Sequence, residues 1–157
     1  MYSIWNDMNE PSVFNTPSKT IPLEALHFKK DGRSFEHRDL HNAYGALHHR
    51  STWRGLLSRD KNTQRPFVLT RSFFMGSQRF GAYWTGDNNS NSNELKGCLI
   101  MLLQNGIAGH PYGGCDIPGF YGNVSEDLFV FFYQLGTYFP FMRAHSHIDF
   151  QKREPWL

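Results

Sequence analysis

The chain has 157 residues and carries 16 lysines and arginines against 14 aspartates and glutamates, so its formal net charge is only +2. This near-balance gives no electrostatic basis for a nucleic-acid partner or for binding at a charged membrane surface. Aromatic residues make up 16% of the sequence, a load that disordered chains do not carry. The longest strongly apolar run, Cys98 to Leu103, is far too short for membrane insertion.

Short β-rich runs alternate with helical patterns along the chain, which is typical of βα units around a parallel sheet. The predicted strands are residues 2–5, 66–70, 80–85 and 141–147. The predicted helices are residues 36–57, 93–105 and 127–139, the last one ending before Pro140. Prolines, a glycine and mixed charge predict a surface excursion at about residues 15–35.

Both ends of the chain are apolar and aromatic, with residues 2–5 at the start and Trp156-Leu157 at the end. We therefore expect the chain to be a piece of a larger protein, with any targeting signal outside it. Its two cysteines, Cys98 and Cys115, show no zinc-finger spacing to a histidine cluster and are predicted to be buried thiols.

Five polar residues each end, or closely follow, a predicted strand: Asp7, Arg71, Asp87, Asp116 and His145. In a barrel of parallel strands these ends emerge on one face, where catalytic groups gather. Two carboxylates that face each other across a pocket are the minimum equipment for cleaving a glycosidic bond. The two aspartates could instead cap helices, and spacing alone does not separate the two interpretations.

The local sequence around both aspartates is more specific. Residues 5–12 (WNDMNEPS) and 84–88 (WTGDN) resemble the nucleophile and acid/base signatures of glycoside hydrolase family 31, the α-glucosidase family. The resemblance continues through residues 70–72 (TRS), 114–120 (GCDIPGF) and 143–147 (RAHSH).

Three further segments resemble one branch of this family, whose members trim glucose from N-linked glycans in the endoplasmic reticulum. They are residues 35–45 (FEHRDLHNAYG), 76–81 (GSQRFG) and 153–156 (REPW). This branch therefore implies the lumen of the endoplasmic reticulum as the location and a regulatory β subunit as a partner.

The family resemblance implies an α/β fold in which residues 1–157 form about the second half of a (β/α)8 TIM barrel, the catalytic barrel. It implies retaining hydrolysis of α-glucosides through a covalent glucosyl-enzyme intermediate, without a cofactor or metal. Asp7 matches the nucleophile, and Asp87 matches the general acid and base. In retaining enzymes these two carboxyl groups lie about 5 to 5.5 Å apart.

The same resemblance implies roles in substrate binding. Arg71 matches a subsite arginine, and a guanidinium near two carboxylates would keep one of them ionised. Asp116 and His145 match residues that bind the hydroxyls of the glucose being cleaved. The residues expected to form apolar walls against the sugar are Trp5, Met8, Trp84 and Phe120. The structural alternatives are core packing for the apolar residues, an ion pair for Arg71 and a buried ring for His145.

The expected substrate is an oligosaccharide or an N-glycan. The shared motifs leave open a lysosomal or digestive α-glucosidase, a transglucosidase or an α-xylosidase. A non-catalytic carbohydrate-binding homologue is a further alternative, although binding alone has no need for both Asp7 and Asp87. We expect the isolated chain to be inactive, because part of a barrel leaves sheet edges unpaired.

Two segments contain histidine and aspartate at short spacing. His145, His147 and Asp149 share a predicted strand, and His37, Asp39 and His41 form a second cluster, so each set offers ligands for a metal. Hydrogen-bonded histidines are the favoured interpretation, with the second cluster bracing the start of a helix.

Asn88 and Asn123 begin Asn-X-Ser sequons, which matter only in a secretory compartment. A glycan at Asn88 would obstruct the pocket.

Overall fold

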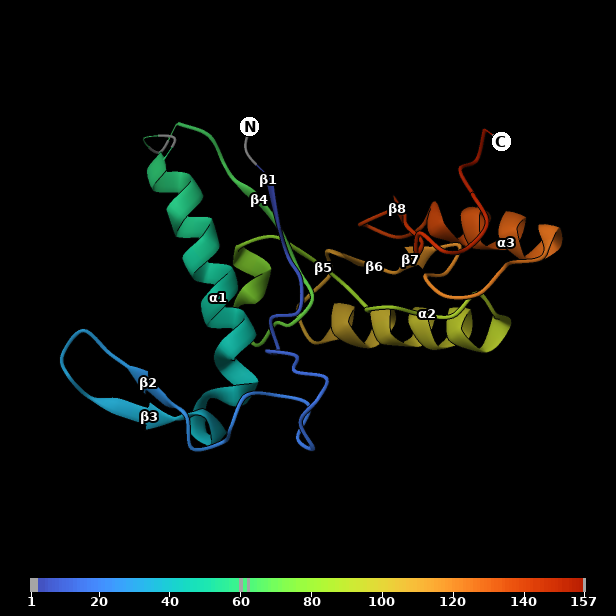
Figure 1. Ribbon diagram of the computed structural model, residues 1–157. Helices are drawn as coiled ribbons and strands as arrows, with labels where there is room; N and C mark the ends of the chain where they lie inside the picture. The colour runs from blue at the N-terminus through green and yellow to red at the C-terminus, as the bar shows by residue number, and fades with distance from the viewer. Residues whose placement is uncertain (1–2, 60, 62, 157) are drawn as a thin grey trace. The chain divides into compact units, whose positions relative to one another are not determined.

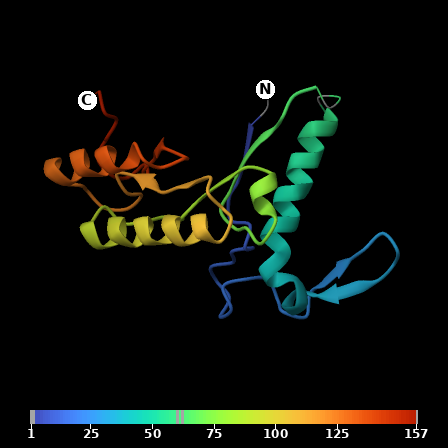
Figure 2. The same ribbon diagram turned by 180° about the vertical axis from the view of Figure 1, so that it is seen from behind.

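The computed structural model describes residues 3–59, 61 and 63–156. The chain divides into two compact units, residues 1–81 and 82–157, each of which is described by itself. Figures 1 and 2 show from opposite sides that both units combine helices with short strands. Within the part of the chain that the structure describes, no helix is both long and apolar enough to cross a membrane.

The first unit is built on a strand–helix–strand arrangement. β1 (Ser3–Asn6) pairs in parallel with β4 (Phe67–Thr70), so that Asn6 lies opposite Thr70. The connection contains α1 (His37–Arg59), which contacts both strands and lies beside them in both views (Figures 1 and 2). The predicted order of strand, helix and strand is confirmed, although Tyr2 of the first predicted strand lies outside the described residues.

Gly45 of α1 lies very close to the segment after β4. A Cβ atom at this position would overlap Ser72 Oγ and lie 2.7 Å from the Ser72 carbonyl carbon. Glycine in a helix interior costs roughly 0.5–1 kcal/mol relative to alanine. The close approach of the helix to the segment that carries Arg71 explains why glycine, rather than a better helix former, occupies this position.

The segment expected to be a surface excursion contains an antiparallel hairpin. β2 (Leu26–Phe28) pairs with β3 (Ser34–Glu36), and both are drawn in blue in Figure 1. Gly32 turns the chain with φ of +83°. The sequence did not reveal this hairpin, because strands of three residues are too short to show a periodic pattern.

His37, the first residue of α1, is fully buried and joins the hairpin to the helix. Its Nε2 lies 3.0 Å from Thr20 Oγ1, and its Nδ1 lies 3.0 Å from His27 Nε2. Burial, with added repulsion from His41 and His27, lowers the pKa of His37. This favours a neutral ring, which donates one of these hydrogen bonds and accepts the other. The histidine cluster thus supports the start of the helix.

The second unit contains two short parallel pairs and two helices. β5 (Ala82–Trp84) pairs with β6 (Gly113–Gly114), and β7 (Asp116–Ile117) pairs with β8 (Arg143–Ala144). α2 (Ser92–Ile107) and α3 (Glu126–Gly136) lie on either side of β7 in both views (Figures 1 and 2). The buried core of this unit consists of Leu95, Cys98, Cys115, Ile117, Phe132 and Phe139.

The predicted elements of the second unit are confirmed with changed ends. The strand predicted at 80–85 is β5, and the helices predicted at 93–105 and 127–139 are α2 and α3. The strand predicted at 141–147 shrinks to the two residues of β8, and the two-residue strands β6 and β7 were not predicted. Cys98 and Cys115 are both free and buried, as predicted. A short 3₁₀ helix, η1 (Ser77–Arg79), belongs to the first unit.

Candidate active site

Asp7 lies directly after β1, at the carboxyl end of a strand in a parallel pair. Its side chain is 37% exposed. Its Oδ1 accepts a hydrogen bond from the backbone N–H of Met8 at 2.8 Å. Met8 has φ of +59°, in the left-handed region that costs a non-glycine residue about 1–2 kcal/mol. The chain therefore turns sharply after the strand and keeps the Asp7 carboxylate at the carboxyl end of the strand.

The two asparagines of the WNDMNEPS segment hold this turn in place. Asn6 exchanges hydrogen bonds of 3.1 and 3.2 Å with Thr52 of α1. Asn9 donates to Thr70 Oγ1 at 2.8 Å and accepts from the backbone N–H of Ser72 at 2.9 Å. Both asparagines are buried, so their lost hydration is compensated by these bonds. The turn that carries Asp7 is thereby fixed to both α1 and β4.

Arg71 follows β4 and brings two carboxylates together. Its Nη1 lies 3.0 Å from Asp7 Oδ1. Its Nε and Nη2 donate to the two oxygens of Glu10 at 2.8 and 3.0 Å, a bidentate arrangement. Its Nη2 also donates to Met8 Sδ at 2.8 Å. The predicted site residues Asp7, Met8 and Arg71 therefore form one contact network.

Glu10 belongs to this network, although the sequence reasoning did not single it out. Burial acts to raise the pKa of Glu10, but hydrogen bonds from Arg71 and Ser12 and the charge of Arg71 outweigh it, so the pKa lies below its ordinary value. Glu10 is thus an ionised anchor for the guanidinium. Its place three residues after Asp7 in the motif was the signal that could have identified it.

The two residues of the first unit that were predicted as apolar walls lie in different surroundings. Trp5 is 46% exposed, so its ring is not packed into a core. Met8 is half-buried, and its sulfur contacts Arg71. Met8 therefore contacts the arginine through its sulfur.

In the second unit, Asp87 lies in the exposed loop after β5. The next residue, Asn88, is buried and anchors this loop. Its carbonyl accepts hydrogen bonds from the backbone N–H groups of Phe120 at 2.6 Å and Tyr121 at 3.1 Å, and its Nδ2 donates to the Asp116 carbonyl at 3.3 Å. The loop that carries Asp87 is therefore tied to the segment that carries Asp116 and Phe120.

Asp116 is fully buried at the start of β7 and is held by Arg143 of β8. Arg143 Nη2 donates to Asp116 Oδ1 at 2.6 Å. The same guanidinium lies 5.2 Å from the ring centre of Trp84 and 5.8 Å from that of Phe141, within the range of cation–π attraction. Arg143 is a second residue that the sequence reasoning passed over, although it lies two positions before His145.

Phe120 and His145 are brought together by stacking. Their ring centres are 5.3 Å apart with an interplanar angle of 29°. The backbone N–H of His145 donates to the Ile117 carbonyl at 3.0 Å, which fixes the strand end beside β7. Trp84, by contrast, is only 2% exposed, so its ring is covered rather than open to a sugar.

The residues of the first histidine cluster have other contacts in the structure. His147 Nδ1 lies 3.5 Å from Asp149 Oδ2, while the His145 ring stacks on Phe120. Among residues 3–59, 61 and 63–156, no three His, Cys, Asp or Glu side chains gather in a way that could hold a metal ion.

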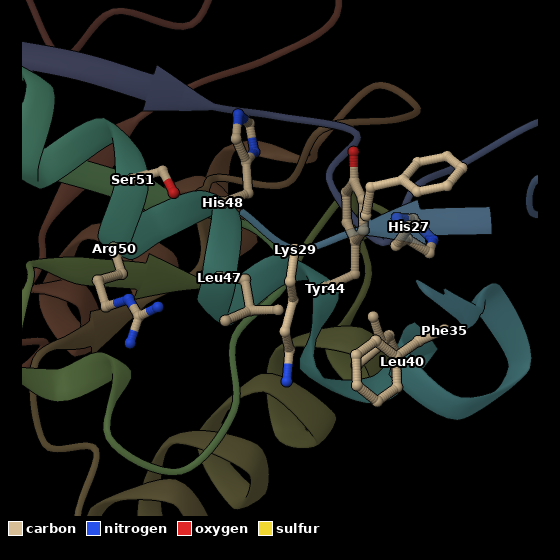
Figure 3. Close-up of a pocket in the computed structure, with 10 residues that line it drawn as sticks. His27, Lys29, Phe35, Leu40, Tyr44, Leu47, His48, Arg50 and Ser51 are labelled. Carbon is tan, nitrogen blue, oxygen red and sulfur yellow. The ribbon is translucent and has the colours of Figure 1, made fainter. Parts of the chain in front are cut away.

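A pocket of about 510 Å³ lies between the β2–β3 hairpin and α1 in the first unit (Figure 3). None of the predicted site residues lines it. It is lined by His27, Phe28, Lys29, Phe35, Leu40, Tyr44, Leu47, His48, Arg50 and Ser51. A smaller pocket of about 290 Å³ is lined in part by Glu10, which Arg71 contacts, and by Ser72, which follows Arg71 in the chain.

Comparison with known proteins gives a consistent result. The family model described as "Glycosyl hydrolases family 31 TIM-barrel domain" matches residues 1–157. A probable glucan 1,3-alpha-glucosidase from Oryza sativa subsp. japonica is 53% identical, and neutral alpha-glucosidase AB from Homo sapiens is 50% identical. Each match covers 98% of this chain and 16% of the relative. The chain therefore spans about 16% of the length of these curated relatives.

Solved structures are also similar to this chain. The Tris-bound glucosidase II alpha subunit is 52% identical with a TM-score of 0.89, over 98% of this chain and 16% of that chain. A heterodimeric complex of the ER glucosidase II catalytic subunit with the binding domain of its regulatory subunit gives the same identity and score, over 97% and 16%. A cycloalternan-degrading enzyme from Trueperella pyogenes, solved with a covalent intermediate, is 30% identical with a TM-score of 0.69, over 81% and 18%.

The predicted similarity to one branch of the family is confirmed, because these matches include alpha subunits of glucosidase II. The predicted α/β fold with parallel strands is confirmed as well. Motifs, strand–helix order and a family match along the whole sequence all agree, and the chain belongs to glycosyl hydrolase family 31 as part of its TIM-barrel domain.

Proposed function

We propose that the protein to which this chain belongs is a retaining α-glucosidase of the glucosidase II type, which removes terminal α-linked glucose from oligosaccharides. Family membership and similarity to glucosidase II alpha subunits support this proposal. The observation that carries it is the Asp7–Arg71 ion pair of 3.0 Å at the carboxyl end of a parallel strand. A carboxylate that attacks an anomeric carbon must be both ionised and accessible.

In the proposed reaction Asp7 is the nucleophile. Its carboxylate forms a bond to C1 of the glucose while the bond between C1 and the leaving oxygen breaks. Asp87 first donates a proton to that oxygen and then removes a proton from the water that opens the glucosyl-enzyme intermediate. Two inversions at C1 release glucose in the α configuration. The covalent intermediate of the 30% identical cycloalternan-degrading enzyme supports this route.

The contacts of Asp7 suggest which oxygen attacks. Oδ1 accepts from the Met8 N–H and faces Arg71, so it is the constrained atom. Oδ2 has no hydrogen-bond partner among the residues that the structure describes. We assign Oδ2 as the attacking atom and Arg71, braced by Glu10, as the group that orients the carboxylate.

We further propose that Asp116 and His145 bind the glucose hydroxyls and that Trp5, Met8 and Phe120 contact the sugar. The exposed ring of Trp5 and the stacked pair of Phe120 and His145 are consistent with this assignment. For Trp84, whose ring is covered and faces Arg143, we propose support of the Asp116–Arg143 pair.

The finer identity of the substrate is also a proposal. The similarity to glucosidase II alpha subunits supports glucose trimming from N-linked glycans in the lumen of the endoplasmic reticulum. The solved complex of a related catalytic subunit with a regulatory-subunit binding domain supports a regulatory β subunit as partner.

The test uses the full-length protein and an aryl α-glucoside. Asp7→Asn should remove nearly all turnover without changing the melting temperature, and the exposed Asp127→Asn is the matched control. A wild-type protein that binds α-glucosides but does not cleave them would identify a carbohydrate-binding homologue instead. The isolated 157-residue chain should be inactive, so a soluble fragment that cleaves the glucoside would contradict the partial-barrel proposal.

A further inference from the structure

We infer that Asn123, and not Asn88, is an acceptor for an N-linked glycan. Both begin Asn-X-Ser sequons in the second unit, Asn88-Asn89-Ser90 and Asn123-Val124-Ser125, and the proposed function uses neither as a modification site. The inference rests on the lumenal localisation proposed above, because N-glycosylation belongs to the secretory pathway.

The side chains of the first sequon are buried or hydrogen-bonded within the fold. Asn88 is 5% exposed, and its Nδ2, the atom that would carry the glycan, donates to the Asp116 carbonyl at 3.3 Å. Ser90 Oγ donates to the Gly122 carbonyl at 3.2 Å and accepts from Arg153 Nη1 at 2.8 Å. A sugar on Asn88 Nδ2 would displace this packing next to Asp87. A chain modified at Asn88 could not adopt the folded loop that carries the proposed acid.

The second sequon is open at both of its functional residues. Asn123 and Ser125 are exposed on the segment between β7 and α3, while Val124 between them is only 7% exposed and anchors the segment. Asn123 Oδ1 accepts from the Gln151 backbone N–H at 3.2 Å. Asn123 Nδ2 has no hydrogen-bond partner within the described residues. A glycan on this nitrogen therefore breaks no contact of the fold.

Ser125 has a second relevant property. It is the N-cap residue of α3, but its side chain makes no capping hydrogen bond. The hydroxyl is thus not needed to start the helix, although capping serines usually serve that purpose. Replacing this hydroxyl should therefore test the sequon without disturbing α3.

The modification is a group transfer from a polyprenyl diphosphate-linked oligosaccharide. The Asn123 amide nitrogen forms a bond to C1 of the oligosaccharide, the bond between that C1 and the carrier diphosphate breaks, and the nitrogen loses one proton. No atom of the proposed catalytic network takes part, since Asn123 contacts neither Asp87 nor Asp116 among the described contacts.

The experiment uses the full-length protein with a cleavable secretory leader, expressed in eukaryotic cells, so that delivery to the lumen does not depend on the proposed localisation. Peptide N-glycosidase in heavy-oxygen water converts each glycan-bearing Asn into a labelled Asp, which mass spectrometry locates. We expect label at position 123 and none at position 88. Asn123→Gln and Ser125→Ala should each abolish the label at 123, and Ser125→Thr, which keeps the sequon, should retain it.

Folded wild-type protein without label at position 123, or with label at position 88, would overturn the inference. Activity on an aryl α-glucoside is measured in parallel and should be unchanged in Ser125→Ala. Loss of activity in the wild-type protein would count against the proposed function alone. Protease protection in microsomes, measured with the protein's own leader, separately tests the localisation.

Discussion

Replacing Glu10 by glutamine should weaken catalysis while leaving the fold intact, because Glu10 holds the guanidinium that faces Asp7. Arg71 donates to both Glu10 oxygens, at 2.8 and 3.0 Å, and reaches Asp7 Oδ1 at 3.0 Å. Glutamine keeps one acceptor oxygen and the shape of the side chain but replaces one charged contact with an amide group that cannot accept from Arg71.

The magnitude follows from these contacts. A hydrogen bond to a charged group contributes about 1.5–3 kcal/mol, and the lower end applies because the Glu10 side chain is 33% exposed. A loss of about 1.5 kcal/mol in transition-state stabilisation corresponds to a roughly tenfold drop in kcat/KM. If Arg71 also loses its contact with Asp7, a second loss of similar size brings the drop to roughly a hundredfold.

The assay measures kcat, KM and unfolding free energy of full-length variants as a function of pH. Because the pKa of Glu10 lies below its ordinary value of 4.5, its contribution to stability is complete above that value and is lost as pH falls through the folded value. The stability difference between wild type and Glu10→Gln should therefore exist at pH 7 and disappear in strongly acidic solution. The exposed Glu24→Gln is the control. An unchanged kcat/KM in Glu10→Gln, with an intact fold, would refute the positioning role.

Two further predictions concern the acid and the fold. Asp87→Ala in the full-length protein should retain cleavage of an aryl glucoside with a very acidic leaving group and lose cleavage of natural glucosides, since only the latter need a proton donor; equal loss on both substrates would show that Asp87 is not the acid. Gly45→Ala should destabilise the protein by about 1–3 kcal/mol because its Cβ would meet Ser72. Gly55→Ala in the same helix, where a Cβ meets nothing within 4 Å, should stabilise it by roughly 0.5–1 kcal/mol. Denaturant unfolding measures both changes, and equal effects at the two positions would contradict the close approach of α1 to Ser72.

The sequence predicted the longer elements well because their patterns extend over several turns or a complete apolar run. The helices α1 and α2 and the strands β1, β4 and β5 all lie where patterning placed them. The hairpin β2–β3 and the two-residue strands β6 and β7 depend on tertiary pairing, which leaves no periodic signal in so few residues. The end of α3 at Gly136 rather than at residue 139 reflects the usual uncertainty of helix boundaries.

Residues of the candidate site could be predicted where they belong to a motif. Their ion-pair partners could not. Asp7 and Arg71 came from motifs and meet in the structure. Glu10 and Arg143, which hold Arg71 and Asp116, were passed over because an ion pair between distant segments is not visible in a linear sequence. For Trp84, whose motif position suggested a wall against the sugar, the structure shows a ring that is only 2% exposed and lies 5.2 Å from the Arg143 guanidinium.

The most direct test of the central claim is the configuration of the first product. Proton NMR of the full-length protein acting on an α-glucoside distinguishes α-glucose from β-glucose before mutarotation mixes them. If Asp7 attacks C1 and Asp87 then activates water, α-glucose must appear first, and Asp7→Asn must abolish its appearance. Early release of β-glucose would contradict a covalent glucosyl intermediate on Asp7.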